Sequence, residues 1–169
     1  MTIETDRLIL RKFTLEDAEE AFHMNNDPEV MKYIIGERFK SVDEVKEMIK
    51  KNVFGDYEKH GYGRMAITLK PSNKFIGFTG LKYNDDFKEV DLGYRLMRKY
   101  WGKGIATESS LPFMNYGFNQ LGLKRIVALA FEGNIGSIKI MKKVGMIFEK
   151  YMVIDGHELV CYAKNHSSK

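Results

Sequence analysis

The chain is poor in the residues that cross-link small domains or hold metal ions. Its 169 residues include a single cysteine, Cys161, so the chain can form neither an intramolecular disulfide nor a cysteine-based zinc site. No two of its four histidines have the i, i+3 or i, i+4 spacing that places two ligands on one helix face: His23, His60, His157 and His166. We therefore expect no metal. We also expect Cys161 to be a buried, inert thiol, because it lies in an apolar run.

Long apolar runs and a strong excess of one charge are missing as well. No stretch approaches the roughly 18 apolar residues of a membrane span, and residues 1–7 lack the apolar core of a signal peptide. The 27 Lys and Arg face 23 Asp and Glu, for a net charge of +4. This balance suits a small polyanion but provides no basic stripe for nucleic acid. We expect a cytoplasmic protein that binds neither nucleic acid nor a membrane.

The residues that are abundant are those of a globular domain. Hydrophobic residues make up 44% and charged residues 30%, with only three prolines, so apolar burial can offset the ordering entropy of folding. The length fits a single domain, which we place at residues 1–165, with residues 166–169 as a frayed tail. The sequence leaves the oligomeric state open, a homodimer included.

Apolar spacing and capping residues predict a mixed α/β order of elements. The run 7–11 predicts a strand, and capping pairs that begin at Thr14 and Ser41 predict two amphipathic helices, the second reaching Gly61. Turn residues separate three strands that should be consecutive and antiparallel: 64–69, 75–82 and 89–96. The rest predicts a helix, a strand, a second helix and a hairpin: 105–121, 125–130, 135–144, and 146–153 with 159–164.

The strand at 89–96 carries two acidic side chains on one face. Apolar residues alternate there with polar ones, so Glu89 and Asp91 share a face while the opposite face is apolar. A solvated outer face explains this alternation as well as a functional site does.

The most informative stretch, residues 96–108, joins that strand to the next helix through a glycine-bearing loop. Free N–H groups at a helix start, together with the helix dipole, form a site for phosphate oxygens. The loop does not match a dinucleotide fingerprint, because Thr107 stands where a third Gly or Ala is needed. It does not match a P-loop either, because Gly104 stands where Ser or Thr is needed. A tight turn is the alternative, and it explains one glycine better than two that flank a lysine.

A second segment, residues 134–146, is informative only together with the rest of the chain. Taken alone, Asn134 is simply a good N-cap for a helix. Five segments together resemble the GNAT superfamily of acetyl-CoA-dependent N-acetyltransferases, and within it the RimJ/RimL-like branch that acetylates ribosomal-protein N-termini. The resemblance runs along nearly the whole chain, in the family's order. The similar segments are 5–11, 27–33, 91–94, 100–108, and Asn134 with Ser137 and Gly145.

The resemblance implies a central, mostly antiparallel twisted sheet of six to seven strands with helices on both faces. It also implies acetyl-CoA, or coenzyme A, as the cosubstrate. Main-chain groups at 96–97 would pair with pantetheine, the loop N–H groups would hold the pyrophosphate with added charge from Arg98 or Lys103, and Asn134 would bond the pantetheine arm. The implied cofactor-binding residues are Leu96, Met97, Arg98, Trp101, Gly102, Lys103, Gly104, Ile105, Ala106, Thr107 and Asn134.

Catalysis by such an enzyme needs a neutral amine, so a carboxylate that accepts the amine proton is useful. Asp91 occupies the strand position that the branch usually fills with Glu and is the first candidate, with Glu89 on the same face as the second. Many relatives protonate the leaving thiolate with a tyrosine at the position of Met141, which a thioether cannot do. The resemblance makes Ser137 the candidate that bonds the sulfur, and an ordinary first-turn serine is the alternative.

The implied activity is acetyl transfer to a primary amine, first of all the N-terminal α-amino group of a protein or peptide. One alternative is a small-molecule amine such as a polyamine, an amino acid or an antibiotic. Another is a coenzyme-A-binding module without turnover, which Met141 favours and the two carboxylates disfavour. The residues that select the acceptor cannot be identified from one sequence, because variable loops build such pockets.

Overall fold

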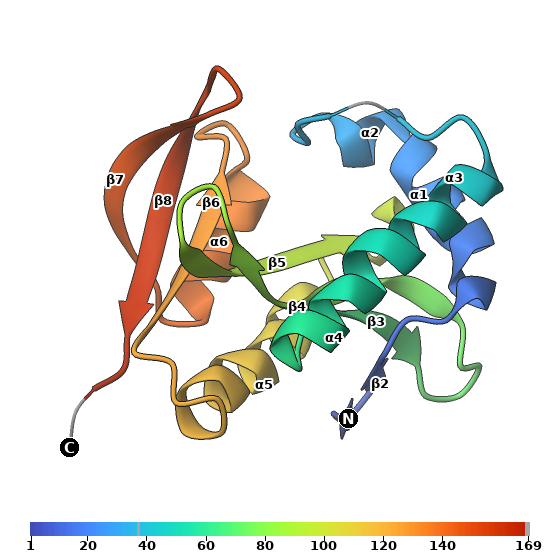
Figure 1. The fold of residues 1–169 in the computed structure, drawn as a ribbon, viewed down its shortest axis with the longest axis horizontal. Coiled ribbons are helices and arrows are strands. Elements are labelled where there is room, and N and C mark those ends of the chain that lie inside the picture. Colours follow the sequence, from blue (N-terminus) through green and yellow to red (C-terminus); the bar gives the residue numbers. More distant parts are fainter. Residues whose placement is uncertain (37, 168–169) are drawn as a thin grey trace.

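The computed structural model describes residues 1–36 and 38–167. They form one eight-stranded sheet with the order β1-β2-β3-β4-β5-β6-β8-β7 (Figure 1). All neighbouring strands are antiparallel except β5 and β6, which are joined through a helix as parallel strands must be. The strands are β1 Thr2–Glu4, β2 Leu8–Arg11, β3 Arg64–Leu69, β4 Phe75–Asn84, β5 Glu89–Leu96, β6 Arg125–Ala130, β7 Ile147–Ile154 and β8 His157–Asn165.

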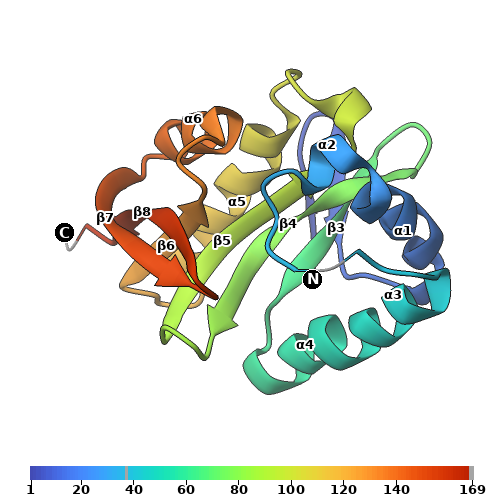
Figure 2. The same ribbon diagram turned by 90° about the horizontal axis from the view of Figure 1, so that it is seen from above.

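Helices lie on both faces of the sheet, with α5 and α6 on one face and α1, α3 and α4 on the other (Figure 2). The predicted helix from Ser41 to Gly61 is present as α3, a π-helical turn and α4 in succession. Among the described residues, no helix combines the length and the apolar character that crossing a membrane requires. The helices are α1 Ala18–Asn26, α2 Pro28–Met31, α3 Val42–Met48, the π-helical turn Ile49–Phe54, α4 Gly55–His60, α5 Ile105–Asn119 and α6 Ile135–Lys143, with 3-10 turns at Leu15–Asp17 and Arg98–Tyr100.

This architecture confirms the predicted mixed α/β fold with a mostly antiparallel sheet and helices on both faces. The predicted number of six to seven strands is wrong by one, because Thr2–Glu4 pairs with β2 as an edge strand. Three residues are too few to show the alternation that reveals a strand in sequence. Of the predicted tail, Ser168 and Lys169 lie outside the described residues, whereas the His166 N–H donates to the Lys124 carbonyl at 2.9 Å.

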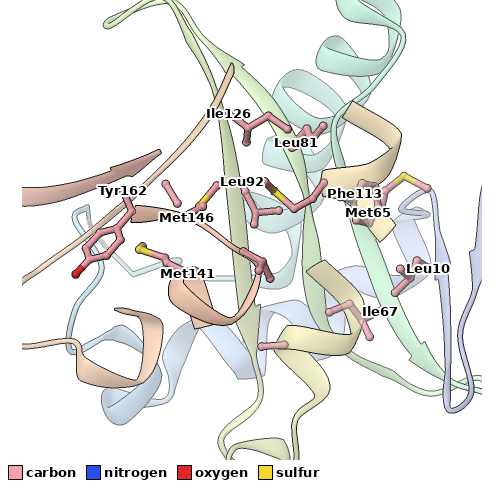
Figure 3. Close-up of a cluster of buried hydrophobic side chains, with 14 of the residues drawn as sticks. Leu10, Met65, Ile67, Leu81, Leu92, Phe113, Ile126, Met141, Met146 and Tyr162 are labelled. Carbon is pink, nitrogen blue, oxygen red and sulfur yellow. The ribbon is translucent and has the colours of Figure 1, made fainter. Parts of the chain in front are cut away.

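Two apolar clusters hold the layers together. The larger lies between the sheet and α5 and α6, and it contains Leu92 of β5, Phe113 of α5 and Met141 of α6 (Figure 3). The smaller lies on the other face, where α1 and α3 pack on the sheet. Cys161 is 1% exposed, as predicted, and burial raises the pKa of its thiol.

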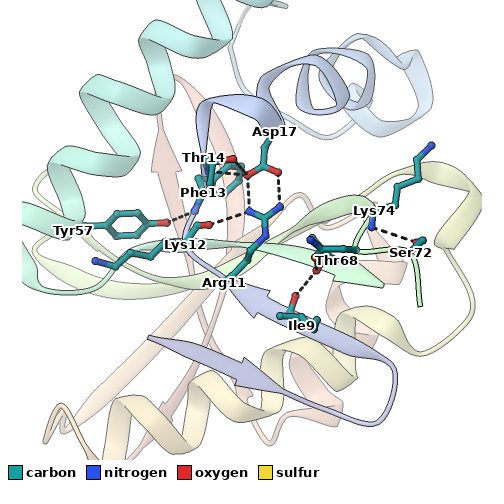
Figure 4. Close-up of polar contacts among 11 residues, drawn as sticks. Ile9, Arg11, Lys12, Phe13, Thr14, Asp17, Tyr57, Thr68, Ser72 and Lys74 are labelled. Carbon is teal, nitrogen blue, oxygen red and sulfur yellow. Dashed lines mark hydrogen bonds and ion pairs between the residues drawn. The ribbon is translucent and has the colours of Figure 1, made fainter. Parts of the chain in front are cut away.

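A polar cluster fixes the chain where β2 leads into α1 (Figure 4). The Arg11 guanidinium donates to both oxygens of Asp17 at 2.8 Å, and Asp17 also accepts the Thr14 N–H at 2.8 Å. The predicted capping pair of Thr14 and Asp17 is therefore present. Tyr57 of α4 accepts the Phe13 N–H at 3.2 Å, which connects this corner to the helices on the same face.

Candidate active site

β5 and β6 separate soon after they meet. Their register contains the single pair Asp91 with Val127, whereas β5 pairs with β4 along its whole length from Glu89 to Leu96. Beyond Asp91, β5 continues away from β6 toward the loop that precedes α5 (Figure 2). The β6-facing edge of β5 is therefore left without a partner strand there, and such an edge can bind an extended ligand through its main chain. We call this edge the splay.

Alternation along β5 decides which main-chain groups face the splay. The Met97 N–H donates to the Ile76 carbonyl of β4 at 2.9 Å, so Leu96 and Tyr94 direct their main-chain groups to the opposite side. The Leu96 carbonyl accepts the indole N–H of Trp101 at 2.9 Å. The role expected of Met97 stays a prediction, and its N–H is already bound by β4. The main-chain groups placed to pair with an extended ligand are therefore those of Tyr94 and the N–H of Leu96.

The loop after β5 turns through two glycines into α5. Gly102 and Gly104 have φ of 71° and 74°, values that residues with a Cβ rarely adopt. Gly104 is the N-cap of α5. The N–H groups of Ile105, Ala106 and Thr107 therefore have no carbonyl partner within the helix, and the helix dipole adds positive potential there. This geometry fits a phosphate group.

Arg7, just before β2, fixes that loop from a distant part of the chain. Its guanidinium donates to the Lys103 carbonyl at 3.0 Å and to the Glu108 carboxylate at 2.7 Å. Glu108 also accepts the Thr5 hydroxyl and the Arg7 N–H. Burial raises the pKa of Glu108, but the bonds from Thr5 and Arg7 outweigh it and hold the pKa below its usual value. The loop is thus tied both to the first turn of α5 and to the N-terminal segment.

Cations surround the same loop. Arg98, Lys99 and Lys103 are all exposed, and the two lysine ammonium groups lie 5.1 and 5.7 Å from the centre of the Tyr100 ring. A cavity of about 540 Å³ adjoins them between α1, α2 and the end of β5, and Met97 and Arg98 contribute to its lining. Among the described residues, no group of three or more His, Cys, Asp or Glu is arranged to hold a metal ion. The cationic side chains on this loop supply positive charge, which favours a polyanionic ligand.

Asp91 is held by a single arginine from β3. Arg64 donates to Asp91 Oδ2 at 2.6 Å and to the Asp91 carbonyl at 3.0 Å, and it also bonds the Gly80 carbonyl. The two side chains are 17% and 14% exposed. A Cβ on Gly93 would meet the Arg64 guanidinium at 2.4 Å, so glycine at this position allows the guanidinium to lie across β5. Among the described residues, Asp91 Oδ1 is buried and has no hydrogen-bond partner.

Glu89 has a different environment from Asp91. Its carboxylate accepts Arg125 Nε at 3.0 Å, and Arg125 donates two further bonds of 2.6 Å to Glu149. The bonds to Glu149 and Glu89 raise the pKa of Arg125. Because Glu89 begins β5 and Arg125 begins β6, this ion pair connects the two strands at the end where they meet. Each carboxylate thus has one oxygen held by an arginine, and Asp91 is the more buried of the two, at 14% exposed against 32% for Glu89.

Ser137 meets a tyrosine that the sequence did not single out. The Tyr94 hydroxyl lies 2.8 Å from the Ser137 carbonyl and 2.9 Å from Ser137 Oγ. Burial raises the pKa of Tyr94 to about 12, although the bond to Ser137 opposes this. Asn134 accepts the Ser137 N–H through Oδ1 at 3.2 Å, so it is an N-cap of α6. Met141 is 1% exposed within the larger core, where its thioether packs among apolar side chains (Figure 3).

The sequence analysis assigned no role to three residues of this site: Arg7, Arg64 and Tyr94. Arg64 and Asp91 are 27 residues apart, and Arg7 and Lys103 are 96 apart. Local periodicity carries no information about pairs at such separations. The one signal in the sequence was Gly93, because a glycine inside a strand often marks a place where another group approaches the backbone closely.

Comparisons with known proteins agree with this geometry. The family model for an acetyltransferase (GNAT) domain matches residues 7–147. An uncharacterized N-acetyltransferase p20 from Bacillus licheniformis is 35% identical over 159 residues, which cover 93% of this chain and 87% of that protein. A spermidine N(1)-acetyltransferase from Escherichia coli strain K12 is 23% identical over 141 residues, covering 83% and 73%. A solved structure of RimL, a ribosomal L7/L12 alpha-N-protein acetyltransferase in complex with coenzyme A, has a TM-score of 0.82 at 18% identity, with 98% of each chain covered.

The chain belongs to the GNAT acetyltransferase family. It is an acetyl-CoA-dependent N-acetyltransferase, and it shares its fold with RimL. The described residues also fit coenzyme A: two glycines in the left-handed region open a helix start, cations surround it, and the splay offers unpaired main chain beside it.

Proposed function

We propose that this N-acetyltransferase acetylates the α-amino group at the N-terminus of a protein or peptide, with Asp91 as the proton acceptor. The observation that carries the proposal is the Asp91 carboxylate. One of its oxygens is bound by Arg64, and the other is buried without a partner among the described residues. A small-molecule amine remains the second candidate acceptor, since a spermidine acetyltransferase is among the relatives.

Binding of coenzyme A would use four parts of the chain. The N–H groups of Ile105, Ala106 and Thr107 would donate to the pyrophosphate at the start of α5. The cations Arg98 and Lys103 would balance its charge. The splay edge of β5 would pair with the pantetheine amides as a missing strand would, and the Asn134 amide would add a bond from α6. Gly102, Gly104 and Trp101 would shape the loop for this contact.

Bound acetyl-CoA supplies an activated acetyl group as a thioester. The attacking amine nitrogen forms a bond to the acetyl carbon, the carbon–sulfur bond breaks, and the nitrogen must lose one proton. Asp91 Oδ1 accepts that proton, directly or through one water molecule, while Arg64 holds the carboxylate in place through Oδ2. Positioning of the two reacting groups contributes as well, because a thiolate leaves readily.

Ser137 would provide a hydrogen bond to the departing sulfur. Its hydroxyl lies against the Tyr94 hydroxyl, so Tyr94 can orient it and share its proton. This pair would take the part that a tyrosine at position 141 plays in many relatives. The core packing of Met141 supports this assignment, because no polar group stands at its position.

The direct test is acetyl transfer to a short peptide by wild-type protein and by Asp91→Asn. The substitution keeps the shape and removes the base, so kcat/KM should fall by about 10²–10⁴-fold near neutral pH. The loss should shrink as pH rises, because more amine then arrives deprotonated. Glu89→Gln is the matched control on the same strand face and should lower stability more than rate. Full activity in Asp91→Asn together with loss in Glu89→Gln would reverse the assignment.

A further inference from the structure

Exposed apolar side chains gather on α6 and β7. Among the described residues, eight large hydrophobic side chains are exposed, and five of them belong to these two elements. Single exposed apolar residues are ordinary on a protein surface, but a contiguous group of them marks an interaction surface. The five residues are Ile135, Ile147, Phe148, Tyr151 and Val153.

Four of these five side chains border one groove. Phe148 and Tyr151 pair in register with Tyr162 and Val160 of β8, which belong to the larger core that α6 covers. Both β7 side chains therefore lie on the α6 side of the sheet, and Val153, two positions after Tyr151, shares that face. A cavity of about 360 Å³ separates these side chains from α6. The exposed apolar members of this α6–β7 groove are Ile135, Phe148, Tyr151 and Val153.

The outer edge of β7 is poorly suited to pairing with another strand. Its register with β8 shifts between Phe148 and Lys150, which leaves Glu149 as a bulge. Glu149 and Lys150 are both exposed. A bulge and charged side chains on an edge strand both hinder the addition of a further strand. A partner would therefore pack its side chains into the groove and would not extend the sheet.

The two ends of the groove carry opposite charges. Glu132 precedes the first turn of α6 and accepts the Tyr151 hydroxyl at 2.9 Å, and Glu158 pairs with Val153 in register. Lys142 lies at the other end, in the last turn of α6, and lines the cavity. A partner with one sign of charge, such as a membrane surface or a nucleic acid, would be repelled at one end. A twofold axis instead places the acidic end of each copy against the basic end of the other.

We propose that the α6–β7 groove is the interface of a twofold-symmetric dimer of this chain. The apolar members of the two grooves cover one another, and Lys142 of each copy lies against the partner's Glu158. Phe148 and Tyr151, whose ring centres are 5.4 Å apart, are the aromatic anchors of the contact. Ser137 of α6 faces β5, so the two copies meet on the other side of that helix and leave the splay open. The dimer is independent of which amine the enzyme acetylates.

Sedimentation velocity over a range of protein concentrations tests the interface. Wild type should form a dimer, and Phe148→Glu should raise the dimer Kd at least about 30-fold, because it would bury a charge at the apolar centre. Val153→Glu, at a side chain that is 69% exposed, should act in the same way if Phe148→Glu does not fold. Leu111→Glu is the matched control, since Leu111 is an exposed apolar residue of α5, and it should keep the wild-type Kd.

Two results of this experiment would overturn the proposal. One is a wild-type protein that stays monomeric at every concentration, which would leave the groove to a different partner. The other is an unchanged Kd in folded Phe148→Glu and Val153→Glu proteins, which would place the dimer contact elsewhere. Circular dichroism shows whether each variant is folded.

Charge reversal tests the twofold arrangement. Lys142→Glu and Glu158→Lys should each raise the dimer Kd about 10-fold, because like charges then meet at both ends of the interface. Mixed at a concentration where each variant alone is mainly monomeric, the two should form a heterodimer, since opposite charges meet again at both ends. Lys50→Glu reverses a charge on the other face of the sheet and should leave the Kd unchanged. A mixture that stays monomeric would show that the two ends do not meet, and the proposal would fall.

Discussion

At the scale of single residues, the site depends on how closely Arg64 can approach β5. Gly93 makes this approach feasible, because a Cβ there would lie 2.4 Å from the guanidinium. The backbone of Gly93 is outside the left-handed region, so replacing it tests the contact rather than the conformation. Asp91 would then lose the cation that holds it, without any change to its own side chain.

Gly93→Ala should therefore lower kcat at least about 10-fold by displacing Arg64 from Asp91, with little change in the Kd for coenzyme A. Steady-state kinetics with a peptide acceptor and calorimetry with coenzyme A measure the two effects. Gly55→Ala is the matched control, since a Cβ on this helical glycine meets nothing within 4 Å, and it should keep full activity. Equal kcat in Gly93→Ala and wild type would show that Arg64 does not position the base.

The pair of hydroxyls at Tyr94 and Ser137 gives a second prediction at this scale. Ser137→Ala should lower kcat about 5- to 10-fold, the effect of one hydrogen bond to the sulfur, and thus less than Asp91→Asn. Tyr94→Phe should cost a similar amount, and the double variant should cost little more than either alone because the two groups act together. Single-turnover rates of the three variants measure this. Fully additive losses would mean that Tyr94 and Ser137 work independently.

At the scale of elements, the N-terminal segment controls the loop before α5. Thr5 and Arg7 bond Glu108, and Arg7 also bonds the Lys103 carbonyl. These contacts join β2, the loop and α5, which are far apart in sequence. The sequence predicted each of the three elements, but it could not show that one arginine connects them.

Glu108 makes this connection sensitive to acid. Its pKa in the folded state is held below the usual value, so its contribution to stability is complete above about pH 4.3, the value expected when unfolded. That contribution is lost as pH falls through the lower folded pKa. Glu108→Gln should lower the unfolding free energy at pH 7 by about 1–2 kcal/mol and flatten the fall in Tm between pH 6 and 3.

Glu47→Gln provides the comparison for this experiment, because the Glu47 side chain is 72% exposed and pairs with Lys50 on the helix surface. Its Tm should follow the wild-type pH profile. If Glu108→Gln shows the same acid-dependent fall in Tm as wild type, then another carboxylate is responsible for it.

How much of each element was predictable follows from its length and capping. The helix at 42–60 and the strands at 64–69 and 89–96 are present where apolar spacing and Ser41 placed them. The edge strand Thr2–Glu4 and the four-residue helix Pro28–Met31 are too short to show periodicity, and both escaped prediction. The bond from the Met97 N–H to the Ile76 carbonyl could not be predicted either, because only the sheet register reveals it.

At the scale of the whole molecule, the proposed reaction site lies where two parts of the sheet meet. Asp91 belongs to the part that ends with β5, whereas Asn134 and Ser137 belong to the helix between β6 and β7. The strands touch at one register pair, closed by the Glu89 and Arg125 ion pair. The larger core runs across this joint with side chains from both parts, among them Leu81, Leu92, Phe113, Ile126, Met141 and Met146 (Figure 3). The splay is therefore supported by a continuous core.

Coenzyme A is proposed to bind at the loop of Gly104 and the start of α5, and every other role in the site depends on this. Calorimetric titration of coenzyme A into wild type and into Gly104→Asp tests this most directly. Wild type should bind one molecule per chain. The folded Gly104→Asp variant should show no binding, because a carboxylate would stand at the helix start where the pyrophosphate belongs. Unchanged affinity in a Gly104→Asp protein with a wild-type circular dichroism spectrum would contradict the account.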